Sequence, residues 1–208
     1  MTTLHLHVDS QFASPYAMSV FVALHEKGLA FDMSTVDLGA REQHAAGFAG
    51  LSLTQRVPTL VHDGFALSES SAITEYIDEE FEGPRLYPTQ PRSRARARQV
   101  QAWLRSDLMP VRQERPTEVV FYGAKAPPLS PAAKEAAAKL YTAAQSLLQD
   151  GAEHLFDQWC IADVDLALML NRLVLGGDSV PSRLEAYAAR QWQQPSVQRW
   201  VNQRRPPL

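Results

Sequence analysis

Cysteine is almost absent from this chain: only Cys160 occurs among its 208 residues. One cysteine excludes a disulfide framework, a zinc site built from several cysteines and a CxxC redox motif. The six histidines lack the spacing of metal ligands, so we expect no metal site. Long hydrophobic runs are also missing. The most apolar stretch, residues 161–175, is interrupted by charged and amide side chains, which is typical of a buried helix and not of a membrane span.

The composition is otherwise that of a globular protein, with 45% hydrophobic and 21% charged residues. The first ten residues, MTTLHLHVDS, contain neither a basic segment nor an apolar core. We therefore expect no secretory signal and a cytoplasmic location. Four arginines at alternate positions between 92 and 98 could indicate nucleic-acid binding. On a helix they form two stripes, and the chain is acidic overall, so we expect no nucleic-acid partner.

Acidic and basic side chains are unevenly distributed along the chain. Residues 1–83 contain 3 basic and 12 acidic residues, whereas residues 84–208 contain 17 basic and 11 acidic ones. A segment with three prolines lies at the change and is typical of a short, stiff linker. We therefore expect one domain in residues 1–83, a linker in residues 84–91 and a second domain in residues 92–208.

The two expected domains differ in their hydrophobic patterns. In the first, apolar residues alternate with polar ones or recur at helical spacing, and Asp63-Gly64 indicates a hairpin turn. The expected strands cover residues 4–8, 31–38, 59–62 and 65–67, and the expected helices cover residues 14–28, a part of 39–54, and 68–81. The second domain shows helical patterns only, with Pro110 expected to stop or kink its first helix. Its expected helices cover residues 91–109, 130–149, 161–175, 181–192 and 195–203. The fold class is thus a small α/β domain followed by an all-α domain.

Ser14-Pro15 is typical of a helix start, with serine as the N-cap and proline in the first turn. The backbone N–H groups and the positive end of the helix dipole at such a place can hold an anion, for example a thiolate. The alternative is an ordinary N-cap that contributes about 1 kcal/mol of stability, and the motif alone favours that interpretation.

Two further motifs suggest binding and also have simpler interpretations. Val57-Pro58 lies between a loop and an expected strand, where a cis bond would leave the backbone of Val57 able to pair with an extended peptide. Most X–Pro bonds are trans, so the pair alone does not indicate a site. Glu69 and Ser70 begin an expected helix, where they could bind an ammonium group and a carboxylate. Capping of that helix by Ser68, Ser70 or Ser71 is an equally good explanation.

Taken together and in order, these motifs make the chain resemble the glutathione S-transferase family. The resemblance covers nearly the whole chain and looks closest to the bacterial members with serine at the active position. The matching stretches are Ser14-Pro15-Tyr16, residues 22–29, residues 56–60, residues 67–73, Ile161-Ala162-Asp163 and residues 194–200. It implies a thioredoxin-like first domain with a mixed four-stranded sheet, a helical second domain, glutathione as co-substrate and a homodimer.

The resemblance also implies roles for individual residues of the first domain. Ser14 would hydrogen-bond the sulfur of glutathione, with Tyr16 as the next candidate. Val57, before a cis Pro58, would pair with the cysteinyl backbone. Glu69 and Ser70 would hold the γ-glutamyl group. The glycine carboxylate needs a cation, for which Arg56 fits best and Arg41 or His44 are alternatives.

The expected activity is glutathione transfer to a small hydrophobic electrophile, as in detoxification, with the electrophile between the domains near Trp103. The first domain lacks cysteine, so members that use a catalytic cysteine are not matched, and the Ser-Ser-Cys motif of maleylacetoacetate isomerases is also absent. Two alternatives remain: a glutathione-dependent peroxidase or disulfide reductase, and a non-enzymatic interaction scaffold. Cys160 stands where the family usually has serine or threonine before Ile-Ala-Asp.

The charge distribution suggests how two copies could associate. An acidic run comprises Asp78, Glu79, Glu80 and Glu82, and a basic run comprises Arg92, Arg94, Arg96 and Arg98. The resemblance places both runs at the dimer interface, where some of these charges would face each other across the two-fold axis. Contact between the two runs within one chain, or exposure of both to solvent, is the equally weighted alternative.

Overall fold

The computed structural model describes residues 3–208, which form two compact units. Unit 1 comprises the chain up to Leu86 together with Gln198–Leu208, and unit 2 comprises Tyr87–Val197. The last residues of the chain are therefore grouped with the first unit, whereas the sequence suggested a second domain in residues 92–208. No helix within residues 3–208 is long and apolar enough to cross a membrane.

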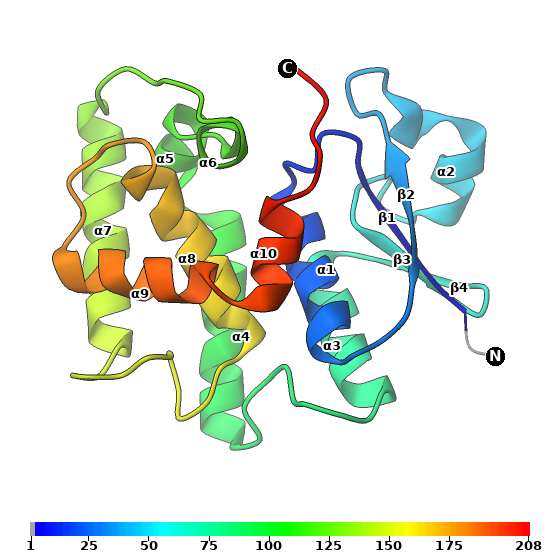
Figure 1. The fold of residues 1–208 in the computed structure, drawn as a ribbon, viewed down its shortest axis with the longest axis horizontal. Coiled ribbons are helices and arrows are strands. Elements are labelled where there is room, and N and C mark those ends of the chain that lie inside the picture. The colour runs from blue at the N-terminus through cyan, green and yellow to red at the C-terminus, as the bar shows by residue number, and fades with distance from the viewer. Residues whose placement is uncertain (1–2) are drawn as a thin grey trace. The chain divides into compact units, whose positions relative to one another are not determined.

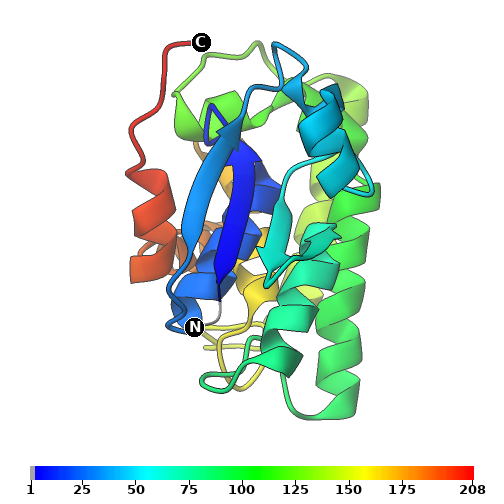
Figure 2. The same cartoon turned by 90° about the vertical axis from the view of Figure 1, so that its right-hand side faces the viewer.

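Unit 1 is built around a four-stranded sheet in the order β2-β1-β3-β4. Its strands are β1 (Leu4–Asp9), β2 (Asp32–Val36), β3 (Thr59–His62) and β4 (Phe65–Ser68). β1 pairs with β2 in parallel, and the other two pairs are antiparallel, so the sheet is mixed as expected. Figures 1 and 2 show α1 (Pro15–Glu26) and α3 (Ser70–Glu80) on one face of this sheet and α2 (Ala46–Leu51) on the other. A short 3-10 helix, Glu42–His44, precedes α2.

Helices α1 and α3 pack against each other beneath the sheet. Every residue of α1 from Ala17 to Leu24 is buried. At the far ends of the two helices, the Nζ of Lys27 lies 3.3 Å from Oδ1 of Asp78 and donates a 2.7 Å hydrogen bond to the carbonyl of Phe81. Asp78 is only 3% exposed. The Asp78 carboxylate is thus paired inside unit 1, so Asp78 does not take part in the expected charge contact across a dimer interface. Glu79, Glu80 and Glu82 are exposed.

The end of the chain belongs to the core of unit 1. Helix α10 (Pro195–Val201) crosses the boundary between the units, and its residues from Gln198 onward belong to unit 1. Trp200 is fully buried, and its ring contacts those of Phe12 and Phe21 at centroid distances of 5.7 and 5.2 Å. The C-terminal segment therefore packs on the loop after β1 and on α1.

Unit 2 contains helices only among its described residues. They are α4 (Pro91–Ser106), α5 (Met109–Glu114), α6 (Thr117–Phe121), α7 (Pro131–Leu147), α8 (Ile161–Val174) and α9 (Ser182–Trp192), followed by the start of α10. α8 is buried along almost its whole length and packs against α4, α5, α6 and α9. The two-part fold expected from the sequence is thus confirmed.

Two short helices, α5 and α6, were not predicted. We expected Pro110 to stop or kink the helix before it, but Pro110 lies in the first turn of α5, where its missing N–H costs nothing. The break comes earlier, because the Asp107 carboxylate accepts the N–H of Leu108 at 2.7 Å and Leu108 takes a left-handed φ of 61°. The proline therefore begins a new helix.

Candidate active site

Ser14 caps helix α1 as its sequence motif predicted. The Ser14 hydroxyl accepts the N–H of Ala17 at 3.2 Å, and Pro15 is the first helical residue. An accepting hydroxyl still has its own hydrogen to donate to another group. The site lies beside the positive end of the helix dipole. Tyr16, the alternative donor, lies partly exposed in the same first turn.

The loop that carries Ser14 is fixed by a buried carboxylate that our sequence analysis did not single out. Asp9, at the end of β1, accepts the N–H of Ala13 at 2.7 Å and that of Ser14 at 3.1 Å. Burial raises the pKa of Asp9, and these two hydrogen bonds and the nearby Arg205 act in the opposite direction. An acidic residue at the end of a buried strand, five positions before a helix cap, is the sequence signal that could have identified it.

The loop before β3 presents the backbone of Val57. The Val57-Pro58 peptide bond is cis, as the family resemblance implied. Two buried hydroxyls fix the loop: the Ser52 Oγ accepts from Thr59 Oγ1 at 2.9 Å, and Thr59 Oγ1 also lies 2.9 Å from the Arg56 carbonyl. Within residues 3–208, the backbone N–H and C=O groups of Val57 make no hydrogen bond. They are available to an extended peptide.

Glu69 and Ser70 form the junction between β4 and α3. Glu69 is exposed and takes φ 76° and ψ 110°, an unfavourable conformation for a residue with a side chain. Such strained residues gather at functional sites, where the surrounding structure maintains them. Ser70, the first residue of α3, is 3% exposed. The Glu69 side chain makes no cap hydrogen bond to α3, so helix capping by Glu69 does not account for its backbone conformation.

The three candidate cations differ in their surroundings. Arg56 is exposed, and within residues 3–208 its guanidinium makes no hydrogen bond or ion pair. Arg41 is also exposed and takes a left-handed φ of 61°. The Nδ1 of His44 lies 2.9 Å from Gln55 Oε1, so this ring is engaged within its own loop.

The topology of the sheet brings three of these segments to the same end of its strands. His7 on β1 is opposite Thr59 on β3, and Thr59 is opposite Ser68 on β4. The loop to Ser14 follows β1, Val57-Pro58 precedes β3, and Glu69-Ser70 follows β4. All three therefore leave the sheet at the same end. The arrangement combines the N-termini of α1 and α3 with the backbone of Val57, which is unpaired within the described residues. Helix N-termini can bind a carboxylate and an anionic sulfur, and an unpaired backbone can bind an extended peptide.

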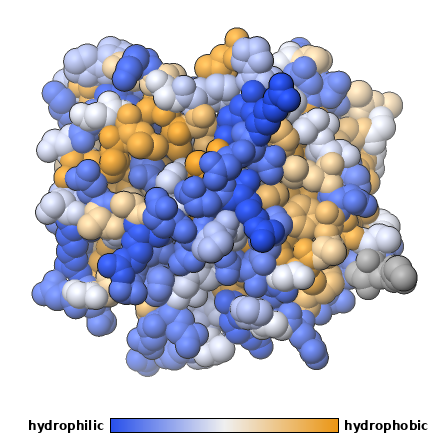
Figure 3. All heavy atoms as spheres, in the orientation of Figure 1, coloured by the Kyte–Doolittle hydropathy of each residue, from blue (hydrophilic) through white to orange (hydrophobic). Residues whose placement is uncertain are grey.

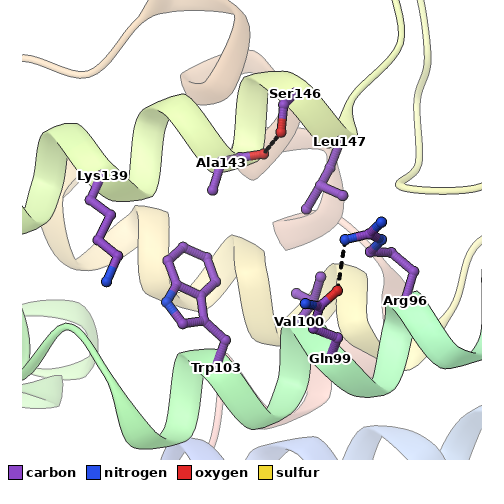
Figure 4. A pocket seen from close by; sticks show the side chains of 8 residues that line it. All are labelled: Arg96, Gln99, Val100, Trp103, Lys139, Ala143, Ser146 and Leu147. Carbon is purple, nitrogen blue, oxygen red and sulfur yellow. Dashed lines mark hydrogen bonds between the residues drawn. The ribbon is translucent and has the colours of Figure 1, made fainter.

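Two further hollows lie in unit 2, away from these residues in the chain. One has a volume of about 320 Å³ and lies between α4 and α7, with the Trp103 ring and Leu147 inside and Arg96 and Lys139 toward its ends (Figure 4). The other, of about 550 Å³, is lined by the prolines before α7, by Tyr141 and by the Gly176-Gly177 turn. In the same orientation as Figure 1, Figure 3 shows hydrophobic residues gathered over α5 and α6 of unit 2.

Cys160 is not a candidate nucleophile. It is fully buried as the N-cap of α8, and burial together with Asp163 raises the pKa of its thiol well above the ordinary value. The Asp163 carboxylate accepts the N–H of Cys160 at 2.9 Å, that of Leu155 at 2.8 Å and the Tyr187 hydroxyl at 2.7 Å. This network fixes the start of the central helix.

Unit 1 has a thioredoxin-like fold and is followed in the chain by a helical unit. The family model of the glutathione S-transferase N-terminal domain matches residues 13–80, and that of the glutathione S-transferase C-terminal domain matches residues 91–204. The second match alone covers more than half of the chain. The chain therefore belongs to the glutathione S-transferase family.

Individual relatives agree with this assignment. A glutathione transferase homologue from Burkholderia BGR1, solved with bound glutathione, is 46% identical, covers 96% of each chain and has a TM-score of 0.77. A maleylacetoacetate isomerase from Methylobacterium extorquens AM1, solved with malonate and GSH, is 26% identical over 97% of this chain and 98% of its own, with a TM-score of 0.75. A probable glutathione S-transferase of Solanum tuberosum is 36% identical over 41% of this chain. That alignment covers 38% of the potato protein, and the alignments with the curated relatives cover about a third to a half of their own length.

Proposed function

We propose that this protein is a glutathione S-transferase that activates the thiol of glutathione for attack on a small hydrophobic electrophile. The observation that carries the proposal is the convergence of Ser14, Val57 and Glu69-Ser70 at one end of the sheet in unit 1. The relative from Burkholderia, which is similar along nearly the whole chain, was solved with glutathione. Its bound ligand supports the choice of thiol peptide.

Each part of glutathione has a counterpart in this arrangement. The Ser14 hydroxyl donates to the sulfur, and the partly exposed positive end of α1 favours the thiolate over the thiol. The Val57 backbone pairs with the cysteinyl unit, as one strand pairs with another. The N-terminus of α3 at Ser70 holds the γ-glutamyl carboxylate, while the Glu69 carboxylate takes its ammonium group. Arg56 is assigned to the glycine carboxylate.

Thiolate formation by itself explains only a small part of the expected acceleration. A free thiol with a pKa of about 8.5 is about 3% ionised at pH 7, and a pKa lowered by about two units gives about 75%. Nucleophilicity falls with the pKa, with a Brønsted slope of about 0.4–0.5, so the net gain is only a few-fold. The larger contribution comes from holding the electrophile against the sulfur. The sulfur then forms the new bond, the leaving group departs, and the thiol proton has already passed to water.

The protein is proposed to act in the cytoplasm as a homodimer, without a nucleic-acid or membrane partner. The exposed Glu79, Glu80 and Glu82 and the arginines at the start of α4 are assigned to the orientation of the two copies. Exposed ion pairs contribute about 0–1 kcal/mol each, so apolar contacts must supply most of the dimer affinity.

The test compares the unaltered protein with Ser14→Ala in glutathione binding by calorimetry and in turnover across pH with a chloronitroaromatic electrophile. We expect Ser14→Ala to lower kcat much more than the affinity for glutathione and to raise the pKa of the bound thiol, followed by thiolate absorbance. Parallel assays with a hydroperoxide and a mixed disulfide separate the peroxidase and reductase alternatives.

Two results would contradict the proposal in different ways. An unchanged pH–rate profile in Ser14→Ala would remove Ser14 as the thiolate donor and make Tyr16 the next candidate. Glutathione binding without turnover of any of the three substrates would support the non-enzymatic scaffold instead.

A further inference from the structure

Arg205, in the C-terminal segment of unit 1, reaches the loop of the candidate site. The Arg205 guanidinium donates to four backbone carbonyls: those of Val201 at 2.6 Å, Trp200 at 3.0 Å, Gln203 at 3.1 Å and Phe12 at 3.1 Å. The first three belong to its own segment, at and after the end of α10 (Figure 1). The fourth lies 193 residues away in sequence, two positions before Ser14.

Phe12 is the point where that loop is most constrained. It takes a left-handed φ of 48°, which is unusual for an aromatic residue. Its N–H donates to the Asp9 carbonyl at 3.1 Å, and its ring makes an edge contact with the buried Trp200. A strained residue persists only where its surroundings maintain it. The Arg205 hydrogen bond and the Trp200 contact both come from the C-terminal segment and both act on Phe12.

Arg205 also acts on the other support of the loop. The buried Asp9 carboxylate holds the N–H groups of Ala13 and Ser14, and a carboxylate accepts such bonds best when it is ionised. Burial opposes ionisation by raising the pKa of Asp9, and the positive charge of Arg205 counters that effect. Loss of Arg205 would therefore remove one hydrogen bond from the loop and weaken two others.

We propose that Arg205 is a positioning residue for Ser14, holding the loop from Asp9 to Ser14 in the conformation that presents the serine hydroxyl to the bound thiol. This inference rests on the proposed function of Ser14. It concerns a contact within unit 1 and assigns a role in thiol activation to a residue near the end of the chain. Arginine suits the position because its planar fork serves several carbonyls at once, which a lysine ammonium cannot reproduce.

The experiment compares Arg205→Ala and Arg205→Lys with the matched control Arg204→Ala, which alters an exposed neighbour. We expect amide hydrogen exchange at Ala13 and Ser14 in the ligand-free protein to accelerate about 10-fold in Arg205→Ala and less in Arg205→Lys. Glutathione affinity should stay within about 3-fold of the unaltered protein, because Val57 and the α3 terminus still bind it. A displaced catalytic group costs up to about 100-fold in rate, so kcat should fall about 10- to 100-fold.

The decisive readout is the pH dependence, which a purely structural role would not change. In Arg205→Ala the pKa of the bound thiol should rise and the pH–rate profile should move with it, while Arg204→Ala leaves both unchanged. Identical profiles and identical exchange rates in the two variants would overturn the role of Arg205 and leave the proposed function standing. Failure of the unaltered protein to bind glutathione would instead overturn the proposed function, and the inference with it.

Discussion

The ion pair between Lys27 and Asp78 gives a quantitative test of how unit 1 is held together. Both side chains are buried, with 0% and 3% of their area exposed, and the charged atoms lie 3.3 Å apart. At an effective dielectric constant of about 20, Coulomb's law gives about 5 kcal/mol for this separation. Asp78→Asn keeps the side-chain oxygen that accepts the Leu86 N–H at 2.8 Å, so it removes the charge and little else.

We expect Asp78→Asn to lower the free energy of unfolding by about 3–5 kcal/mol, because it leaves the Lys27 ammonium buried without a counter-charge. For a chain of this size that corresponds to a melting temperature lowered by about 6–20 °C. Arg85 lies 3.8 Å from the same carboxylate, but its side chain is half exposed and adds little. Urea denaturation and calorimetry measure the two quantities.

The control is Glu79→Gln, which neutralises an exposed carboxylate one position along the same helix. It should change stability by less than about 0.5 kcal/mol. Removing both charges while keeping the acceptor for the Leu86 N–H, by Lys27→Met with Asp78→Asn, should recover most of the loss, because no buried charge remains unpaired. A loss below about 1 kcal/mol in Asp78→Asn would refute the reasoning and show that Lys27 finds another partner or reaches water.

Two further predictions concern unit 2. Cys160→Ser should keep activity and stabilise the fold by up to about 1 kcal/mol in urea denaturation, because a hydroxyl is a better N-cap than a thiol; loss of activity in a folded variant would contradict this. The Lys139 ion pair and the N–H groups of Leu108 and Trp103 lower the pKa of Asp107 from 3.8 to about 2. A lowered pKa stabilises the fold above pH 4, and this stabilisation is lost as the pH falls toward 2. Asp107→Asn should therefore be less stable than the unaltered protein at pH 6, with the difference shrinking between pH 4 and pH 2; a difference independent of pH would contradict the shift.

Local signals made much of unit 1 predictable. Ser14-Pro15 indicated the start of α1 because a cap and a proline act within one turn. Asp63-Gly64 indicated the β3–β4 hairpin because these two residues favour a tight turn by themselves. Asp63 does take a left-handed φ of 47°. The order of these elements is what placed Ser14, Val57-Pro58 and Glu69-Ser70 at one end of the sheet.

What the sequence did not reveal depends on contacts between distant residues. Nothing near Arg205 indicates that its side chain reaches Phe12, 193 residues earlier. The sequence placed Asp78 in an acidic run that we expected at the dimer interface, and only the packing of α1 against α3 brings Lys27 beside it. Gly176 is a similar case. A side chain at this position would place its Cβ 2.7 Å from Cδ of the buried Arg115, and no pattern in the neighbouring sequence predicts this close contact.

The central claim is that unit 1 binds glutathione at the end of the sheet where Ser14, Val57 and Ser70 meet. Backbone amide chemical shifts of the isotope-labelled protein, followed during titration with glutathione, test it most directly. The account predicts that the largest shifts occur at Ser14, Val57 and Ser70 and that the Trp103 indole N–H in unit 2 does not move. Shifts concentrated at Trp103 and the α4–α7 hollow, with none at the three site amides, would contradict it.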